Sequence, residues 1–115
     1  MQYLRGYCIL LADPAVASLN DLSGTQQAEY LCDMALVGNA LLEVTGAHRI
    51  NYAIMGNSDP YLHAHIVPRF ASEPEQYLHD QPWSYPESVM RENSFDYERD
   101  KELIQQLRRA IQAKL

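Results

Sequence analysis

Two histidines separated by one residue constrain this chain more than any other feature. His63 and His65 lie in the run YLHAHIVPR (residues 61–69), whose alternating apolar residues are typical of a β-strand. Side chains two positions apart in a strand point to the same face of a sheet. His63 and His65 therefore project from one surface, with Tyr61 next in the same row. Two imidazoles on one face can bind a metal, hold a phosphate, or supply a nucleophile beside a proton donor.

The rest of the chain predicts an α+β fold in one domain over residues 1–115, with an antiparallel sheet that carries the histidine strand. Ser23 and Gln26 form a capping box that begins a long helix over about 24–45, and Gly46 ends it. This helix is expected to pack on the sheet through an apolar stripe of Leu31, Met34, Ala35, Leu41, Leu42 and Val44. The other predicted elements are strands at 6–12 and 49–55, a turn at 56–60, an irregular but ordered loop at 71–92 and a helix at 95–115. The last helix is expected to pack on the sheet or against a second subunit.

The charge balance and the cysteines narrow the class of protein. A formal net charge of -6 argues against general nucleic-acid binding, although a local site on an acidic protein can still take a small phosphorylated ligand. Cys8 and Cys32 match no metal-ligand spacing, so we interpret both as buried structural thiols. Reduced cysteines, no signal-peptide architecture and no run of membrane-spanning length together predict a cytoplasmic protein with no membrane partner.

The histidine strand resembles the motif of the histidine triad family of nucleotide hydrolases and transferases. In that motif three histidines alternate with apolar residues, and Pro-Arg often follows. Residues 61–69 match it in register, with Tyr61 in the position of the first histidine and Arg69 at the end. The sequence Gly-Asn-Ser at 56–58 resembles the family's Gly-Gln-Ser/Thr at the same distance before the motif, and the order of elements agrees over about residues 5–70.

The resemblance implies a covalent mechanism on a small-molecule nucleotide. His63 would be the nucleophile that attacks the α-phosphorus, and His65 would contact the phosphate, as two imidazoles on one rigid strand can do. Ser58 would complete the catalytic set, while Asn57, Tyr61 and Arg69 would contact the substrate. Water would then release a nucleoside monophosphate. The resemblance implies no metal and no other cofactor, and relatives are often homodimers.

The chain departs from the family pattern at three places. Tyr61 can donate a hydrogen bond as histidine does, but it does not become cationic near neutral pH. Ala15 occupies the position of a further family histidine. The first predicted strand lies almost at the start of the chain, so the domain is expected to be short at its N-terminus. These departures motivate an alternative, a degenerate member that binds nucleotide or phosphate without efficient turnover.

Other interpretations of the same side chains stay open. His63 and His65 could ligate one metal ion, which needs a third ligand from His48, Asp59 or His79. His48 is otherwise a favourable charge at a helix end, and His79 a solvated loop side chain. Arg69 can reach a phosphate or form a surface ion pair. Trp83 and Tyr85 can stack on a base, although anchoring of their loop onto the core is favoured.

Overall fold

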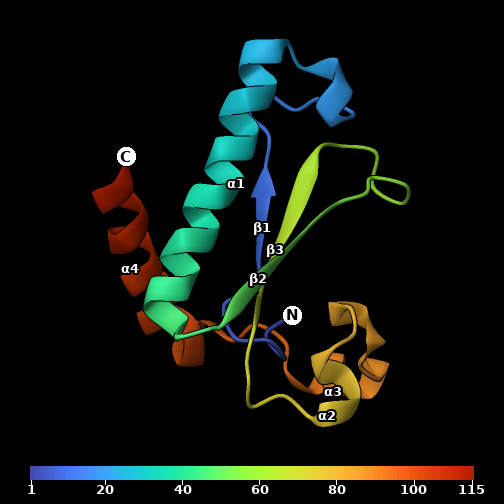
Figure 1. Ribbon diagram of the computed structural model, residues 1–115, viewed down its shortest axis with the longest axis vertical. Coiled ribbons are helices and arrows are strands. Elements are labelled where there is room, and N and C mark those ends of the chain that lie inside the picture. The colour runs from blue at the N-terminus through green and yellow to red at the C-terminus, as the bar shows by residue number, and fades with distance from the viewer.

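The histidine strand β3 (His63–Arg69) lies in the centre of a three-stranded antiparallel sheet in the computed structural model, which describes residues 1–115 (Figure 1). Its neighbours are β1 (Cys8–Leu11) and β2 (Arg49–Ile54), in the order β1-β3-β2. Both neighbours are shorter than the predicted strands. The register places Leu11 opposite His63 on one side and Ala53 opposite His65 on the other.

The long helix α1 (Gly24–Thr45) has the predicted bounds. Ser23 accepts from the backbone N–H of Gln26, and Gly46 ends the helix with φ of 72° in the left-handed region. One apolar side of α1 packs on the sheet face opposite the histidines. The resulting core consists of Tyr30, Met34 and Leu41 from α1 with Leu62, Ala64 and Ile66 from the strand and its approach. The predicted stripe was wrong at Leu31 and Ala35, because both are exposed, and Tyr30 is buried instead of Leu31.

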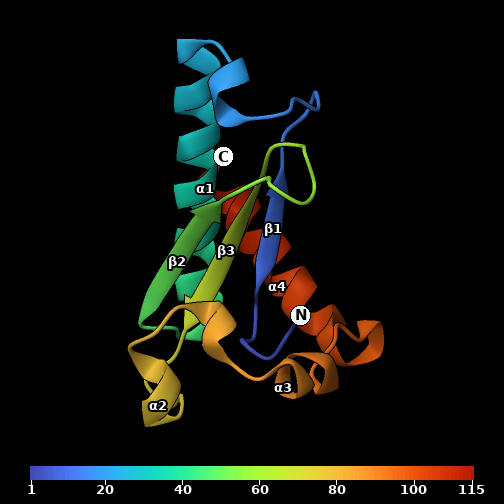
Figure 2. The same cartoon turned by 90° about the vertical axis from the view of Figure 1, so that its right-hand side faces the viewer.

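The C-terminal helix α4 (Tyr97–Lys114) packs beside α1, on the same side of the sheet (Figure 2). Asp96 caps its first turn by accepting from the Arg99 N–H. Leu107 reaches the core beneath α1. The helix α4 therefore packs mainly against α1 and also contributes to the core between α1 and the sheet.

The segment after β3 contains three short helices, so the predicted irregular loop was wrong in this respect. They are α2 (Glu75–Leu78), η2 (Pro82–Ser84) and α3 (Glu87–Glu92), with a further turn η1 (Leu19–Asp21) before α1. Figure 2 shows this segment at the end of the sheet where β3 finishes. It is anchored by a second buried cluster of Leu4, Tyr7, Val67 and Tyr85, with Trp83 packed against it. The α2–α3 segment thus covers part of the histidine face, and Trp83 and Tyr85 do anchor it.

The two cysteines have different environments. Cys8 is partly buried, and burial raises the pKa of its thiol to about 11. Cys32 is exposed on α1, so the interpretation of Cys32 as a buried thiol was wrong. Neither forms a disulfide. The α+β architecture is confirmed, and none of the helices combines the length and apolar character needed to cross a membrane.

Candidate active site

The histidine row begins at the first residue of β3. The Nδ1 atom of His63 lies 2.8 Å from the backbone carbonyl oxygen of Tyr61. A carbonyl oxygen can only accept, so this contact assigns the imidazole proton to Nδ1. The other nitrogen of His63, Nε2, then keeps its lone pair. A fixed neutral imidazole with a free Nε2 is the form that can attack an electrophilic phosphorus.

The ring of His63 lies between two other rings. The ring centroid of Tyr61 is 4.7 Å away at an interplanar angle of 36°, and that of His65 is 5.2 Å away at 69°. His63 is 7% exposed, while Tyr61 on its outer side is 42% exposed. The structure therefore brings Tyr61, His63 and His65 together as the motif predicts. The Tyr61 ring also shields His63 from solvent on that side.

His65 is held by a residue outside the motif. The hydroxyl of Tyr7, which directly precedes β1, lies 2.7 Å from His65 Nδ1. Trp83 packs its ring edge-on against His65 at a centroid distance of 5.3 Å. A Tyr7 phenol that donates to Nδ1 leaves the His65 proton on Nε2.

The electrostatic environment supports these protonation states. Burial lowers the pKa of His65, and the neighbouring His63 lowers it further. Burial raises the pKa of Tyr7. Near neutral pH, Tyr7 is therefore a protonated donor and His65 a neutral imidazole. The pair of histidines thus presents one nitrogen lone pair, on His63, and one N–H donor, on His65.

The remaining predicted site residues lie apart from this row. Asn57 and Ser58 are exposed in the Gly56–Pro60 connection between β2 and β3, and neither side chain hydrogen-bonds a histidine. Arg69 lies at the opposite end of β3 from His63, about 20 Å along the strand at 3.3 Å per residue.

Arg69 is a buried structural residue, so the expectation of a surface ion pair was wrong. It is 3% exposed, and its guanidinium donates to Glu73, to Asn51 and to the backbone carbonyls of Tyr77 and Asp80. Burial works to raise the pKa of Glu73, but hydrogen bonds from Arg69, Tyr85 and the Phe70 N–H hold it below its ordinary value. With every N–H group engaged, Arg69 has no donor left for a substrate phosphate.

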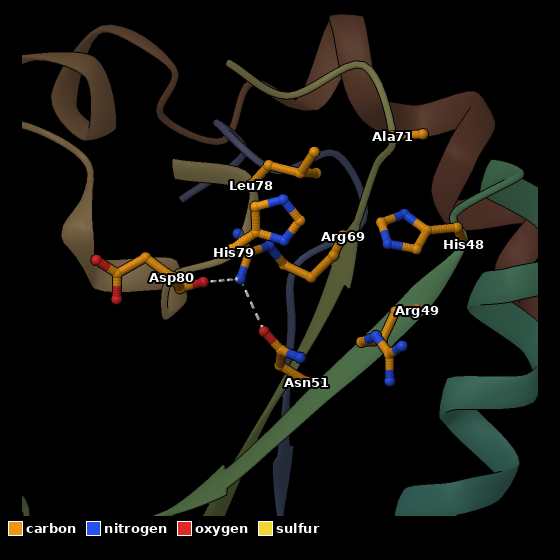
Figure 3. Close-up of a pocket in the computed structure, with 8 residues that line it drawn as sticks. All are labelled: His48, Arg49, Asn51, Arg69, Ala71, Leu78, His79 and Asp80. Atoms are coloured by element: carbon orange, nitrogen blue, oxygen red, sulfur yellow. Dashed lines mark hydrogen bonds between the residues drawn. The ribbon is translucent and has the colours of Figure 1, made fainter. Parts of the chain in front are cut away.

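The third ligand that a metal site at His63 and His65 needs is not present. The chain contains no group of three His, Cys, Asp or Glu side chains placed to hold one ion. Of the candidates, His48 and His79 line a different cavity, next to Arg69 (Figure 3). The metal-binding interpretation therefore finds no support in the arrangement of the donor groups.

Tyr7 is the site residue that the motif does not contain. Its contact with His65 joins residues 58 positions apart in the chain. A weak signal is present in the sequence, because Tyr7 opens the apolar run that forms β1, and an aromatic residue there faces one side of the sheet. Which side it faces depends on the β1–β3 register, and Cys8 opposite Ile66 settles this.

A small α+β domain with two histidines on the open face of its central strand defines a class of histidine-site proteins. Comparison with solved structures is consistent with this class. A histidine triad protein from Bradyrhizobium japonicum is 31% identical over 91% of this chain and 75% of its own length, with a TM-score of 0.72. Two further histidine triad proteins share the fold. The one from Sinorhizobium meliloti is 22% identical over 90% of this chain and 73% of its own length, with a TM-score of 0.73. The one from Marinobacter aquaeolei is 19% identical over 93% of this chain and 74% of its own length, with a TM-score of 0.76.

The chain belongs to the histidine triad family. The identity and coverage of the Bradyrhizobium protein establish this, and the other two structures agree in fold. No protein-family model matches the chain, and no match is found among curated proteins. The family assignment thus depends on three-dimensional similarity together with the histidine strand.

Proposed function

We propose that this protein is a nucleotide hydrolase or nucleotidyl transferase that acts at the α-phosphate of a nucleoside 5′-phosphate derivative. The observation that carries the proposal is the pairing of protonation states. His63 donates from Nδ1 to the Tyr61 carbonyl and keeps Nε2 as a nucleophile, while His65 accepts a hydrogen bond from Tyr7 at Nδ1 and keeps Nε2–H as a donor. Such a pair suits attack on phosphorus beside a group that binds its oxygens.

The proposed reaction has two displacements. His63 Nε2 forms a bond to the α-phosphorus as the bond to the leaving group breaks, and the leaving group departs with the electron pair. The His65 Nε2–H hydrogen-bonds a non-bridging oxygen, which stabilises the charge that develops there. Water then displaces His63, and a nucleoside monophosphate is released. Splitting one displacement into two steps on a rigid strand lowers the orientation cost of each.

Tyr61, Ser58 and Asn57 complete the proposed site. Tyr61 borders His63 and can donate its hydroxyl to a phosphate oxygen. Ser58 and Asn57 lie in the turn that leads into the strand and have donors free for the phosphate or the leaving group. Arg69 is left out of the substrate contacts, since its donors are already used.

Intact-protein mass spectrometry after acid-free mixing with adenosine phosphoramidate tests the proposal. Wild type is expected to carry a nucleotidyl adduct and to release AMP with time, and His63→Ala is expected to do neither while remaining folded. Arg109→Gln is the control, because Arg109 is exposed on α4, away from the histidine row. Unchanged turnover in His63→Ala would rule out the assigned nucleophile.

A second candidate is a nucleotide-binding protein with little turnover. It is favoured by the ring of Tyr61, which takes the place of a family histidine and helps leave His63 only 7% exposed. Calorimetric titration with AMP separates the two candidates. Binding without an adduct on wild type supports the second, and an adduct supports the first.

We also propose that the protein forms a homodimer. Both β1 and β2 are edge strands of a three-stranded sheet, and such edges are commonly covered by another chain. Light scattering on the purified protein gives the molar mass directly. A mass equal to one chain at micromolar concentration would contradict the dimer without affecting the proposal on catalysis.

A further inference from the structure

A second pair of histidines lies at the far end of the sheet face that carries the first. The backbone N–H of His48 donates to the Arg69 carbonyl at 3.0 Å, which places His48 where β3 ends. His79 directly follows α2. Both line one cavity of about 390 Å³, with their rings on opposite sides of it (Figure 3). The four histidines of the chain are thus divided between two places, His63 with His65 and His48 with His79.

The walls of this cavity, which we call the far cavity, are predominantly basic. His48, Arg49, Arg69 and His79 all line it, and Asp80 supplies the only carboxylate among its lining residues. The Asp80 carboxylate accepts from the Gln81 N–H at 2.7 Å, and Figure 3 shows it directed away from the cavity. On a chain of net charge -6, a place where the permanent charge of Arg49 meets two imidazole rings attracts an anion.

Several donors on the cavity wall have no strong partner in the protein. Arg49 is exposed and takes part in none of the ion pairs. His79 is 3.8 Å from Glu75 in a highly exposed pair, which is a weak interaction. Asn51 accepts from Arg69 at 2.9 Å through Oδ1, so its amide nitrogen stays available as a donor.

Arg69 has a different role in the far cavity. Glu73 neutralises its charge in a buried pair at 3.0 Å, and its donors are engaged by the protein. It therefore forms a rigid wall and orients Asn51. The groups left to meet a ligand are the Arg49 guanidinium and the rings of His48 and His79.

The far cavity adjoins the proposed active site through a second cavity of about 380 Å³. Both cavities are lined by Arg49 and Asn51, and the second also contains Trp83 and Ala53. Trp83 contacts the ring of His65, and Ala53 lies opposite His65 in the sheet. The far cavity is then about 13 Å from His65 at 3.3 Å per residue along β3.

We propose that the far cavity is a binding site for a phosphate-class anion, held by Arg49, His48, His79 and the Asn51 amide. Arg49 supplies a permanent charge and a planar set of donors, which suits a tetrahedral oxyanion. The anion is a free phosphate-class ion, because Arg69 in the cavity wall lies about 20 Å along β3 from His63, too far for a short polyphosphate chain whose first phosphorus sits at His63. The proposal does not rest on the proposed function.

Proton NMR of the four histidine rings tests this on the intact protein. Inorganic phosphate is expected to shift the ring signals of His48 and His79 with a saturable dependence on concentration. Arg49→Gln is expected to weaken this binding about tenfold, the usual effect of losing a charge-assisted hydrogen bond. Arg109→Gln is the matched control, because Arg109 is exposed on α4 in the other layer, and it is expected to bind phosphate as wild type does.

Adenosine 5′-tetraphosphate added to His63→Ala, which cannot turn it over in the proposed mechanism, is the second probe. It is expected to shift His65 with one affinity and His48 and His79 with another, because the phosphate chain is too short to span both places. Shifts of His48 and His79 with inorganic phosphate alone assign a free ion. The inference is overturned if neither probe moves His48 and His79, or if Arg49→Gln leaves their shifts unchanged. Adduct formation on His63 is measured in the separate mass-spectrometry experiment. Failure of the proposed catalytic function therefore leaves the anion site untouched, and the reverse also holds.

Discussion

The hydroxyl of Tyr7 lies 2.7 Å from Nδ1 of His65, and this contact selects which nitrogen of His65 carries the proton. A phenol that donates to Nδ1 leaves the proton of a neutral His65 on Nε2. A residue that precedes β1 thereby fixes an N–H donor in the middle of β3. Tyr7 is a positioning residue, because it acts on the proposed phosphate only through His65.

Replacing Tyr7 by phenylalanine should lower kcat/KM by roughly three- to tenfold near pH 8, the effect expected for one lost hydrogen bond. Neutral His65 can then hold its proton on Nδ1, which leaves no donor facing the substrate. As the pH falls below the pKa of His65, which burial has lowered, both nitrogens become protonated and the donor returns. The ratio of wild-type to variant rates should therefore shrink toward acid pH.

Tyr3→Phe provides the control for this measurement. Tyr3 lies in the same aromatic cluster, with ring centroids 6.2 Å from Tyr7, but its hydroxyl donates to the Pro82 carbonyl instead of to a histidine. We expect no pH-dependent change in its rate ratio. A ratio for Tyr7→Phe that stays constant across the pH range would mean that Tyr7 serves packing only.

Tyr61→His tests whether the tyrosine limits catalysis. An imidazole at this position can become cationic beside the phosphate, and a charged hydrogen bond contributes about 1.5–3 kcal/mol. The rate of AMP release should therefore rise roughly tenfold or more. The Nδ1 contact of His63 is made to the backbone carbonyl of Tyr61, so it survives the substitution. Tyr61→Phe, which lacks any donor, should be slower than wild type, and a faster Phe variant would contradict the assigned role.

The parts of the site that the sequence predicts are those governed by local periodicity. Alternation in β3 places His63 and His65 on one face, and the Ser23–Gln26 box gives the start of α1, because both depend on neighbours within four residues. Cys32 illustrates the limit on α1. One position corresponds to about 100° around a helix, so a small error in the buried stripe assigns Leu31 and Cys32 to the core although both are exposed and Tyr30 is buried.

The remaining features depend on contacts that no local pattern contains. Tyr7 reaches His65 only through the β1–β3 register, and Arg69 becomes buried only because the α2–α3 segment folds back over the end of β3. The pair of Arg69 with Glu73 is not indicated by its spacing, because residues 69–73 form the end of β3 and a turn instead of a helix.

Two arginine–glutamate pairs with the same spacing and length offer a test of burial. Arg69–Glu73 and Arg91–Glu87 are both 3.0 Å apart, but the side chains of the first are 4% and 5% exposed and those of the second 73% and 76%. Glu73→Gln should lower the free energy of unfolding by about 3–5 kcal/mol, because Arg69 is left buried without its counter-charge. Glu87→Gln should change it by less than about 1 kcal/mol. Equal effects in urea unfolding would show that burial does not govern the first pair.

Glu73 should also give the protein a specific sensitivity to acid. Its pKa is lower in the folded chain than its ordinary value, so the folded state favours the ionised carboxylate. The resulting stability is present above the unfolded pKa of about 4.3 and is lost as the pH falls through the folded pKa. Urea unfolding of wild type between pH 6 and pH 3 should show this loss. The Glu73→Gln variant, compared at the same pH values, should lack that part of it, and an identical pH dependence would contradict the assignment.

Gly38→Ala and Gly24→Ala, both in α1, should have different effects on stability. A Cβ atom at Gly24 meets nothing, and alanine favours a helix by up to about 1 kcal/mol, so that variant should be neutral or slightly more stable. A Cβ atom at Gly38 would overlap the hydroxyl end of the Tyr52 ring on β2, where overpacking costs about 1–3 kcal/mol. Thermal and urea unfolding should rank Gly38→Ala below Gly24→Ala. In a Tyr52→Ala background the difference should disappear, since the overlapping ring is gone, and a difference that persists there would place the constraint on Gly38 elsewhere.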